Sequence, residues 1–424
     1  MMWIMLIIIV AMALIGVPMS FSILTGSVWY ILASGMPQTL LIQRLIMSVG
    51  DSFSMLAIPF FMLAGTIMNA GGVATRIFNF CNTLVGDIPG GLGHVNVFCS
   101  VIFAGMSGSA LADTGGIGAI ELKAMKDAGF DDDFSAAITG ASSCLGPIIP
   151  PSTGMVLYAM MAEESVGKLF IAGIIPGIIM AVVMCLMVYI TAKRRNYPVS
   201  PRATLKERGE ALWRAIPALL SPIILLSGIL LGIFSATEAS VVCCVYSLFL
   251  GIFIYRELPM KDVYKVFLDT LKSSGMIMSL VTFSMVLATI LNYNQIPQMM
   301  ATFAVTHISS RVGILLCCMA LIIVAGMVID VTPAMLILIP IMLPVIRSYG
   351  FNTIAFGVGS TLLFSQGLLT PPVGSILYVL ADYTKMPVMR IAKAVFPYII
   401  VFMILAFTFI MVPQICTFLP GLIQ

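Results

Sequence analysis

Long apolar stretches dominate the chain, and short polar segments interrupt them. Stretches such as Ile216–Phe234, Val241–Tyr255 and Val395–Val412 are apolar on every side, without the alternation that marks the strands of a membrane β-barrel. An apolar segment of about 20 residues crosses a bilayer as a helix, and a helix satisfies its own backbone hydrogen bonds there. The pattern predicts an all-α polytopic membrane protein. Met1–Tyr30 is too long and apolar for a cleaved signal peptide, so we expect it to form the first membrane helix.

The composition agrees with this assignment. Of the 424 residues, 60% are hydrophobic and only 9% are charged, whereas a soluble domain carries about 25% charged residues. These values exclude a soluble multidomain protein, a secreted disulfide scaffold, a disordered chain and a nucleic-acid binder. The nine cysteines and two histidines form no metal-binding motif, so we expect no zinc or haem centre.

Basic residues gather in three polar segments, which predict the orientation of the chain. These segments are 193–214, 256–272 and 382–393, and the positive-inside rule places all three in the cytoplasm. The first segment suits a cytoplasmic linker. Within it, Leu205–Trp213 fits an amphipathic helix, and a plain solvated loop fits equally well.

The chain also consists of two related halves, which correspond at a constant offset of 221 residues. Matching blocks at one offset indicate an internal repeat, with a first repeat at 1–192 and a second at 215–424. The matching pairs are Ala104-Gly105-Met106 with Ala325-Gly326-Met327, Gly129-Phe130 with Gly350-Phe351, Gly146 with Gly367, Pro150-Pro151 with Pro371-Pro372, and Pro176 with Pro397.

The basic segments give these halves opposite orientations. Counting spans from them places Glu121–Asp133 in the cytoplasm and the corresponding stretch, Arg347–Asn352, outside. The sequence therefore predicts an inverted repeat, an architecture found in many secondary transporters.

Each half contains one segment with a polar, helix-breaking centre. The segment at about 92–126 is interrupted by Ser107–Gly116, and the segment at about 311–347 by Asp330–Pro333. The apolar arms, of about 12 to 17 residues, are shorter than a membrane span. Two such arms joined within the membrane form a re-entrant hairpin, whose tip must be buried in protein or meet water.

The crossing that follows each hairpin is broken as well. Gly146–Gly154 interrupts the segment at about 134–161, and Gly367–Gly374 interrupts the segment at about 354–380. Proline frees backbone carbonyls of the preceding turn, and these carbonyls with Ser and Thr hydroxyls are hard oxygen ligands suited to Na⁺. Helix N-termini beside them favour an anion. The sequence predicts cation sites that flank an anion site.

Three acidic residues stand out by position. Asp113 and Asp330 lie deepest in the predicted hairpins, where an ionisable group is a functional candidate. For both, a helix cap remains an alternative. Glu238 is expected to cap the start of a helix.

Several motifs, in order along almost the whole chain, carry a family resemblance. They are Asp51-Ser52-Phe53 with Ile58-Pro59-Phe60-Phe61, Pro89-Gly90-Gly91-Leu92-Gly93, Ser107–Thr114, Gly146–Ser152, Asp330-Val331-Thr332-Pro333 and Gly367–Gly374. With these motifs the chain closely resembles the large membrane subunit (M or DctM type) of tripartite ATP-independent periplasmic (TRAP) transporters.

The resemblance implies an elevator-type, Na⁺-coupled importer in the bacterial inner membrane. It implies two partners: a small four-helix membrane subunit, which is not fused to the start of this chain, and a soluble periplasmic substrate-binding protein. The implied substrates are small organic anions, such as C4-dicarboxylates, sialic acid, sugar acids and keto acids. For a chain that resembles a transporter subunit, we also expect no organic cofactor and no enzymatic activity.

The resemblance also implies site residues. One Na⁺ site would use oxygens near Ser107, Ser109, Gly146, Ile149 and Pro150, and the other near Gly326, Thr332, Gly367, Thr370 and Val373. The substrate would lie near Ser109, Ser152, Thr153 and Asp330. Tyr293-Asn294 departs from the family, because many members carry an Arg or a Glu just before the Gln-Ile-Pro-Gln stretch. If that position contacts the substrate, this chain holds its anion differently or prefers another one.

Other functions remain open at this stage. A Na⁺- or H⁺-coupled anion symporter that works without a binding protein fits the same pattern. An intramembrane aspartyl protease would need Asp113 and Asp330 to face each other on continuous helices, and its Gly-x-Gly-Asp motif is absent. A purely structural membrane subunit would leave the paired breaks unexplained.

Overall fold

The computed structural model describes residues 1–50 and 53–422, and every regular element in this part of the chain is helical. The all-α prediction is confirmed. Asp51-Ser52 of the first family motif lie outside the described residues. The elements are α1 (Met2–Leu14), α2 (Met19–Ser34), α3 (Gln38–Gly50), η1 (Phe53–Leu56), α4 (Ala57–Ala70), α5 (Val73–Val85), α6 (Gly91–Ser107), α7 (Ala110–Gly115), α8 (Ile117–Asp127), α9 (Asp132–Ser143), α10 (Thr153–Ala162), α11 (Val166–Arg195), α12 (Leu205–Leu230), α13 (Ala236–Phe249), η2 (Leu250–Ile254), α14 (Met260–Tyr293), α15 (Ile296–His307), α16 (Arg311–Val328), α17 (Val331–Ser348), α18 (Thr353–Gly367), α19 (Ser375–Thr384), α20 (Val388–Met411) and α21 (Gln414–Leu422).

Eight helical stretches in the described part of the chain are long and apolar enough to cross a membrane, judged by length and composition. They include α11, α12, α14 and α20. The chain is therefore a multi-pass membrane protein.

The N-terminal segment is not the single membrane helix that its hydropathy predicts. It forms α1 and α2, which pack against each other. Gly16 between them has a φ of +90°, and Pro18 caps the start of α2. A left-handed glycine ends a helix readily, and proline lacks the amide that continuation would need. The prediction of one helix over Met1–Tyr30 is wrong for this local reason.

The predicted linker at 193–214 is mostly helical. α11 continues to Arg195 and α12 begins at Leu205, which leaves residues 196–204 between them. Thr204 and Glu207 form a reciprocal capping box at the start of α12, which satisfies two otherwise free amides. α12 then runs to Leu230 without a break, so the predicted helix at Leu205–Trp213 forms the start of a longer helix, and the alternative of a plain solvated loop is wrong for these residues.

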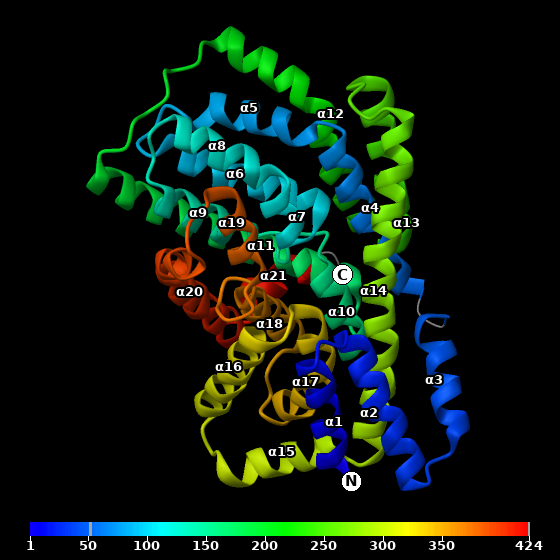
Figure 1. Ribbon diagram of the computed structural model, residues 1–424. Helices are drawn as coiled ribbons and strands as arrows, with labels where there is room; N and C mark the ends of the chain where they lie inside the picture. The colour runs from blue at the N-terminus through cyan, green and yellow to red at the C-terminus, as the bar shows by residue number, and fades with distance from the viewer. Residues whose placement is uncertain (51–52, 423–424) are drawn as a thin grey trace.

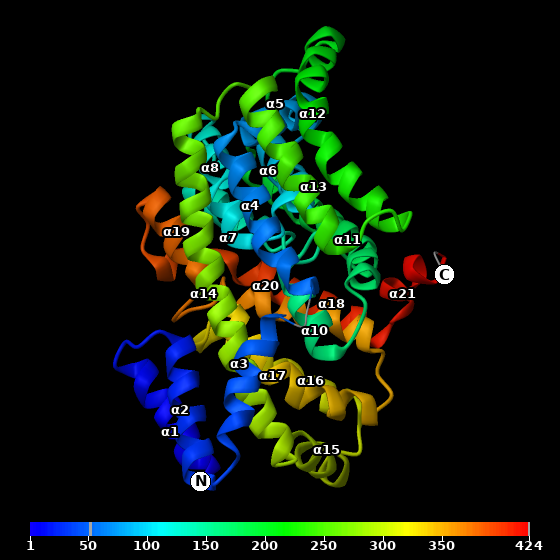
Figure 2. The ribbon, with the colours of Figure 1, turned by 90° about the vertical axis from the view of Figure 1, so that its right-hand side faces the viewer.

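Two groups of helices correspond to the predicted hairpins. In the first, α6 packs against α7 and α8, and in the second, α16 packs against α17. In Figures 1 and 2, α6–α8 lie in the upper part of the molecule, α16 and α17 lie in the lower part, and α14 runs along both. The arms α16 and α17 have 18 residues each, so the prediction that the arms are too short to span is wrong for the second hairpin.

Helix boundaries recur at the offset seen in the sequence. α6 ends at Ser107 and α16 at Val328, and 328 − 107 = 221. α7 and α17 begin at Ala110 and Val331, which are also 221 residues apart (331 − 110). The helices α9 and α18 begin at Asp132 and Thr353, again 221 residues apart (353 − 132).

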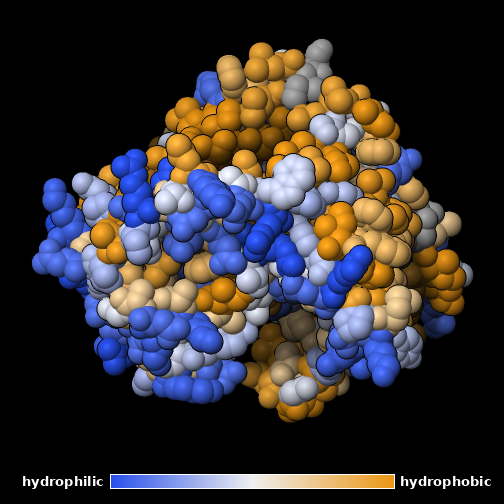
Figure 3. All heavy atoms as spheres, turned by 90° about the horizontal axis from the view of Figure 1, so that it is seen from above, coloured by the Kyte–Doolittle hydropathy of each residue, from blue (hydrophilic) through white to orange (hydrophobic). Residues whose placement is uncertain are grey.

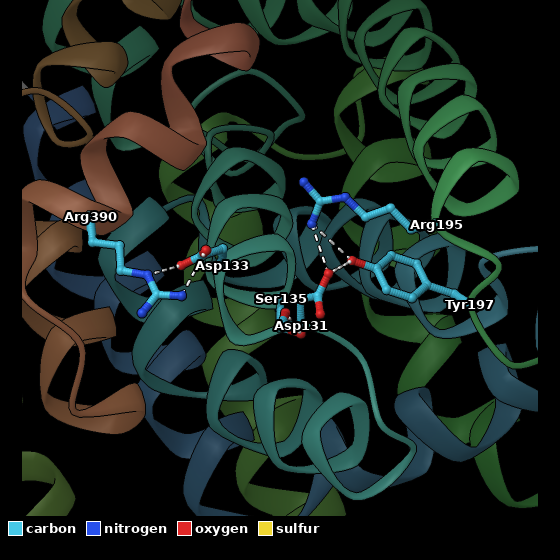
Figure 4. Close-up of polar contacts among 6 residues, drawn as sticks. All are labelled: Asp131, Asp133, Ser135, Arg195, Tyr197 and Arg390. Atoms are coloured by element: carbon cyan, nitrogen blue, oxygen red, sulfur yellow. Dashed lines mark hydrogen bonds and ion pairs between the residues drawn. The ribbon is translucent and has the colours of Figure 1, made fainter.

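Ion pairs join the start of α9 to the end of α11 and to the start of α20. The sequence predicts that these three segments lie on the same side of the membrane. Arg195 Nη1 lies 2.9 Å from Asp131 Oδ2, and the Tyr197 hydroxyl donates to the same oxygen at 2.7 Å. Arg390 donates to both carboxylate oxygens of Asp133, at 2.7 and 3.0 Å. Figure 4 shows both groups, which connect the start of α9 to the end of α11 and to α20. Figure 3 shows the molecule from above the view of Figure 1, with hydrophilic residues gathered over one part of that face and hydrophobic residues over the rest.

Candidate transport site

A cavity of about 360 Å³ lies where the two hairpin tips meet the breaks of the two interrupted helices. Ser109 and Asp330 reach it from the tips, and Thr153 reaches it from the first break. These are three of the six residues predicted for the substrate site. Thr332, predicted as a Na⁺ ligand, also lines it. One face of α14 closes the cavity with Ser273, Met276, Ile277 and Leu280.

The first tip owes its shape to Gly108. This residue ends α6 with a φ of +61°, and a Cβ there would collide with the carbonyl oxygen of Pro151. Only glycine combines that backbone conformation with so close an approach. Ser109 then caps α7, accepting from the amide of Ala112 at 3.4 Å. The Thr153 hydroxyl reaches the Gly108 carbonyl at 3.4 Å, so the tip lies directly against the break.

The residues of the first predicted Na⁺ site are partly brought together. A Cβ built on Gly146 would lie 3.0 Å from the carbonyl carbon of Ser109, which places the break against the tip. The carbonyl of Pro150 lies 3.9 Å from the Cβ position of Gly105 in α6. The Ser107 hydroxyl is buried and has no hydrogen-bond partner. An orphaned buried hydroxyl is costly, and an oxygen-seeking cation at this point would satisfy it. Ile149, by contrast, packs its side chain against Gly177 of α11.

The second predicted site shows a still closer backbone approach. A Cβ on Gly367 would lie 2.5 Å from the carbonyl oxygen of Gly326. The amide of Val373 donates to the Met327 carbonyl at 3.3 Å. Thr370 donates its hydroxyl to the Gln366 carbonyl at 2.7 Å and keeps lone pairs free. Carbonyls and hydroxyls thus gather here, as a hard cation requires, while Thr332 stands in the cavity wall.

Three predicted substrate residues do not line the cavity. Ser152 is buried and caps α10; its hydroxyl donates to the Pro147 carbonyl at 2.5 Å. Asn294 lies at the end of α14, where its side-chain oxygen accepts from the Tyr30 hydroxyl at 2.8 Å. Tyr293 beside it is exposed. A role for these residues in substrate binding stays a prediction.

The two deep aspartates have different surroundings. Asp330 caps α17, accepting from the Val331 amide at 2.9 Å, and also lines the cavity. Asp113 is buried within α7 and accepts from the Ser100 hydroxyl at 2.9 Å. The cap of that helix is Ser109, so the cap alternative for Asp113 is wrong. Because Asp113 does not line the cavity, the two carboxylates do not form the facing pair that an aspartyl protease needs. Glu238 caps α13 in a box with Ser235, as predicted.

Several polar residues of the site were not predicted from the sequence. Thr361 and Ser365 of α18 line the cavity. Gln366 is buried beside Gly367, and neither atom of its side-chain amide has a partner. A lone glutamine inside an apolar crossing was the visible signal, since buried polar groups of this kind need a partner.

The comparisons with known proteins identify relatives. Residues 6–415 match the family described as "Tripartite ATP-independent periplasmic transporter, DctM component". The chain is 37% identical to the sialic acid TRAP transporter permease protein SiaT of Haemophilus influenzae, covering 96% of this chain and 66% of that protein. It is also 37% identical to the sialic acid TRAP transporter large permease protein SiaM of Vibrio cholerae, covering 97% of this chain and 95% of that protein. The YdaH transporter of Alcanivorax borkumensis shares the fold, with a TM-score of 0.64 at 13% identity over 90% of this chain and 88% of that one.

Proposed function

The chain belongs to the DctM component family of tripartite ATP-independent periplasmic transporters, and on that premise we propose that it imports a small organic anion together with Na⁺. Its relatives are named as transporter permeases and not as enzymes. The proposed substrate carries a carboxylate, as a sugar acid, keto acid or C4-dicarboxylate does. The relatives above are named for sialic acid, which belongs to the same chemical class.

One observation carries the proposal: both hairpin tips and both helix breaks meet around a single cavity. No Lys, Arg or His is among the residues that line it, whereas Asp330 is. An anion in such a cavity lacks a fixed counter-charge, and burying an unpaired charge is expensive. Hydroxyls and helix N-termini supply hydrogen bonds to the anion. Na⁺ ions at the adjacent backbone clusters, Ser107 with Gly146 and Gly326 with Gly367, would supply the positive charge.

The recurring helix boundaries support the proposal of an inverted repeat. The sulfur of Cys144 lies 3.7 Å from the carbonyl oxygen of Ser365, and these positions correspond, because 365 − 144 = 221. A contact between equivalent residues is expected where a pseudo-two-fold axis passes between two halves. The two hairpins lie in the upper and lower parts of the molecule in Figures 1 and 2, which fits the same symmetry.

The proposed movement follows from this arrangement. The hairpins with α9–α10 and α18–α19 form a unit that carries the cavity, and helices such as α14 form the scaffold that it moves along. The electrical driving force is substantial, since one elementary charge crossing 100 mV is worth about 2.3 kcal/mol. Two Na⁺ ions per monoanion move one net positive charge inward and so drive accumulation.

The proposed location is the bacterial inner membrane, with residues 193–214, 256–272 and 382–393 on the cytoplasmic side. The ion pairs of Asp131 with Arg195 and of Asp133 with Arg390 support a common side for two of these segments. The proposed partners are a small four-helix membrane subunit, which widens the scaffold, and a periplasmic binding protein, which delivers the substrate.

Uptake into proteoliposomes tests the function. The chain is reconstituted with its small subunit and supplied with binding protein and labelled substrate under an imposed Na⁺ gradient. We expect uptake that requires both the gradient and the binding protein. Uptake that is indifferent to Na⁺ would refute the coupling, and uptake without the binding protein would favour a self-sufficient symporter.

A further inference from the structure

Glu121 in α8 is a buried carboxylate without a role in the proposed transport site. Its side chain is 1% exposed, and neither carboxylate oxygen has a hydrogen-bond partner. The chain has seven glutamates, and the other six are exposed or only partly buried. An ionised carboxylate in such surroundings carries a large desolvation cost unless it is paired.

The groups around Glu121 provide no compensating charge. Its titratable neighbours are Asp113 on α7, Cys81 on α5 and Cys99 on α6, and none of them is a cation. From α9, Thr139 packs its methyl group against α8 at Gly118. The lysines of α8, Lys123 and Lys126, line a separate surface pocket with Asp132 of α9 and Tyr383 of α19. No ion pair found among the described residues includes Glu121.

Buried polar side chains lie near this carboxylate, and their hydrogen bonds go to other groups. We call this set, Asn96, Ser100, Asp113, Thr139 and Ser142, the polar seam. Ser100 donates to Asp113 at 2.9 Å. Asn96 donates to Thr139 at 2.7 Å and accepts from Ser142 at 2.6 Å. One carboxylate oxygen of Asp113 therefore accepts a hydrogen bond while its other oxygen has no partner, and Glu121 accepts none at either oxygen.

The seam belongs to the first half only. At the offset of 221, Glu121 corresponds to Met342, Asp113 to Ala334, and Ser100 to Leu321. Met342 and Ala334 are buried in the second half as apolar residues. In the second half, the apolar side chain of Met342 fills the position that corresponds to Glu121. Packing alone therefore does not require a carboxyl group there, and Glu121 has another purpose.

We propose that Glu121 is a proton-binding site, which holds its proton as a neutral carboxylic acid while it is buried. A metal ion needs several oxygen ligands at once, and neither oxygen of this carboxyl group has a hydrogen-bond partner. A proton needs only the carboxylate itself. The bound proton moves with α8, and it is released or exchanged when water reaches that helix. The inference concerns the protonation of the resting protein, so it stands or fails independently of Na⁺ coupling.

Infrared spectroscopy of the purified protein in lipid at neutral pH tests the proposal. We expect an absorption of a protonated carboxyl group in the wild type that loses intensity in Glu121→Gln. The matched control is Asp133→Asn, which removes a carboxylate that is paired with Arg390 and should leave that absorption in place. Absence of the band in the wild type, or an unchanged intensity in Glu121→Gln, would overturn the proposal.

A second measurement avoids the variant, in case Glu121→Gln fails to fold. The wild type is labelled with ¹³C at the glutamate carboxyl carbons and followed by solid-state NMR. We expect one of the seven glutamates to remain protonated at neutral pH while the others are ionised. Seven ionised glutamates would refute the site.

Discussion

The contact between Gly326 and Gly367 leaves no room for a side chain, and Gly367→Ala perturbs it directly. The added Cβ would lie 2.5 Å from the Gly326 carbonyl oxygen and 2.8 Å from its carbonyl carbon and Cα. Ordinary contact begins at 3.4 Å, so relief requires a displacement of about 0.9 Å (3.4 − 2.5). The opposing atoms are backbone atoms that no rotamer change can move. α16 and α18 must therefore separate.

The expected magnitude follows from this overlap. Overpacking of a tightly packed interior costs about 1–3 kcal/mol. The same displacement would move backbone oxygens of the second proposed Na⁺ site, and a loss of about 1.4 kcal/mol in binding weakens the affinity tenfold. We expect Gly367→Ala to lower the thermal stability and to require about tenfold more Na⁺ for half-maximal stabilisation.

The assay is thermal unfolding of the purified protein across a Na⁺ titration, with K⁺ balancing the ionic strength. Gly275→Ala is the matched control, because a Cβ at Gly275 in α14 meets nothing within 4 Å and alanine favours a helix by about 1 kcal/mol over glycine. If Gly367→Ala matched the wild type in both stability and Na⁺ response, the reasoning from the contact would be refuted. A lower stability with an unchanged Na⁺ response would refute the ligand assignment alone.

Three further predictions concern single groups. Ser107→Ala removes an unpartnered hydroxyl, so we expect unchanged or higher stability without Na⁺ and a roughly tenfold weaker Na⁺ response; an unaltered Na⁺ titration would contradict the first cation site. The hydrogen bonds from Tyr197 and Arg195 lower the pKa of Asp131, so its stabilising contribution is complete above about pH 4 and disappears as the pH falls through the lowered pKa. Asp131→Asn should flatten that part of an acid-denaturation profile, by a small amount because the pair is exposed, and an identical acid limb would argue against the ion pair. Thr204 caps α12 because its hydroxyl accepts from the Glu207 amide at 3.2 Å. Thr204→Ala should therefore lower the free energy of unfolding by about 0.5–2 kcal/mol in a denaturant titration. The control Thr25→Ala, at an exposed hydroxyl within α2, should lower it less.

The sequence predicted those features that depend on local backbone chemistry. Gly108, Pro147 and Asp330 interrupt apolar segments, and the structure breaks or caps helices at or beside each of them. The offset between the halves was visible because Pro-Pro pairs and glycines cannot be exchanged freely where the backbone is tightly constrained.

Features that depend on a balance between segments were less predictable. Hydropathy does not reveal that Gly16 and Pro18 divide the N-terminal segment, because the stretches before and after them are both apolar. Nor does the charge at 193–214 reveal that α12 continues through Pro217 and Pro222. Prolines are tolerated in membrane helices when neighbouring groups compensate for the lost bonds. The unpartnered amide of Gln366 and the isolation of Glu121 became apparent only from side-chain contacts.

The length and the apolar surface of α14 have a consequence for the proposed movement of the transport unit. With 34 residues, it extends about 51 Å, well beyond the roughly 30 Å of a hydrocarbon core. Ser273, Met276, Ile277 and Leu280 present a mostly apolar stripe to the cavity, and such a wall offers a passing solute little to recognise. If the unit moves along α14 as proposed, substitutions along that stripe would alter the rate of transport while the tips keep their choice of solute. Rate and selectivity can therefore diverge independently during evolution.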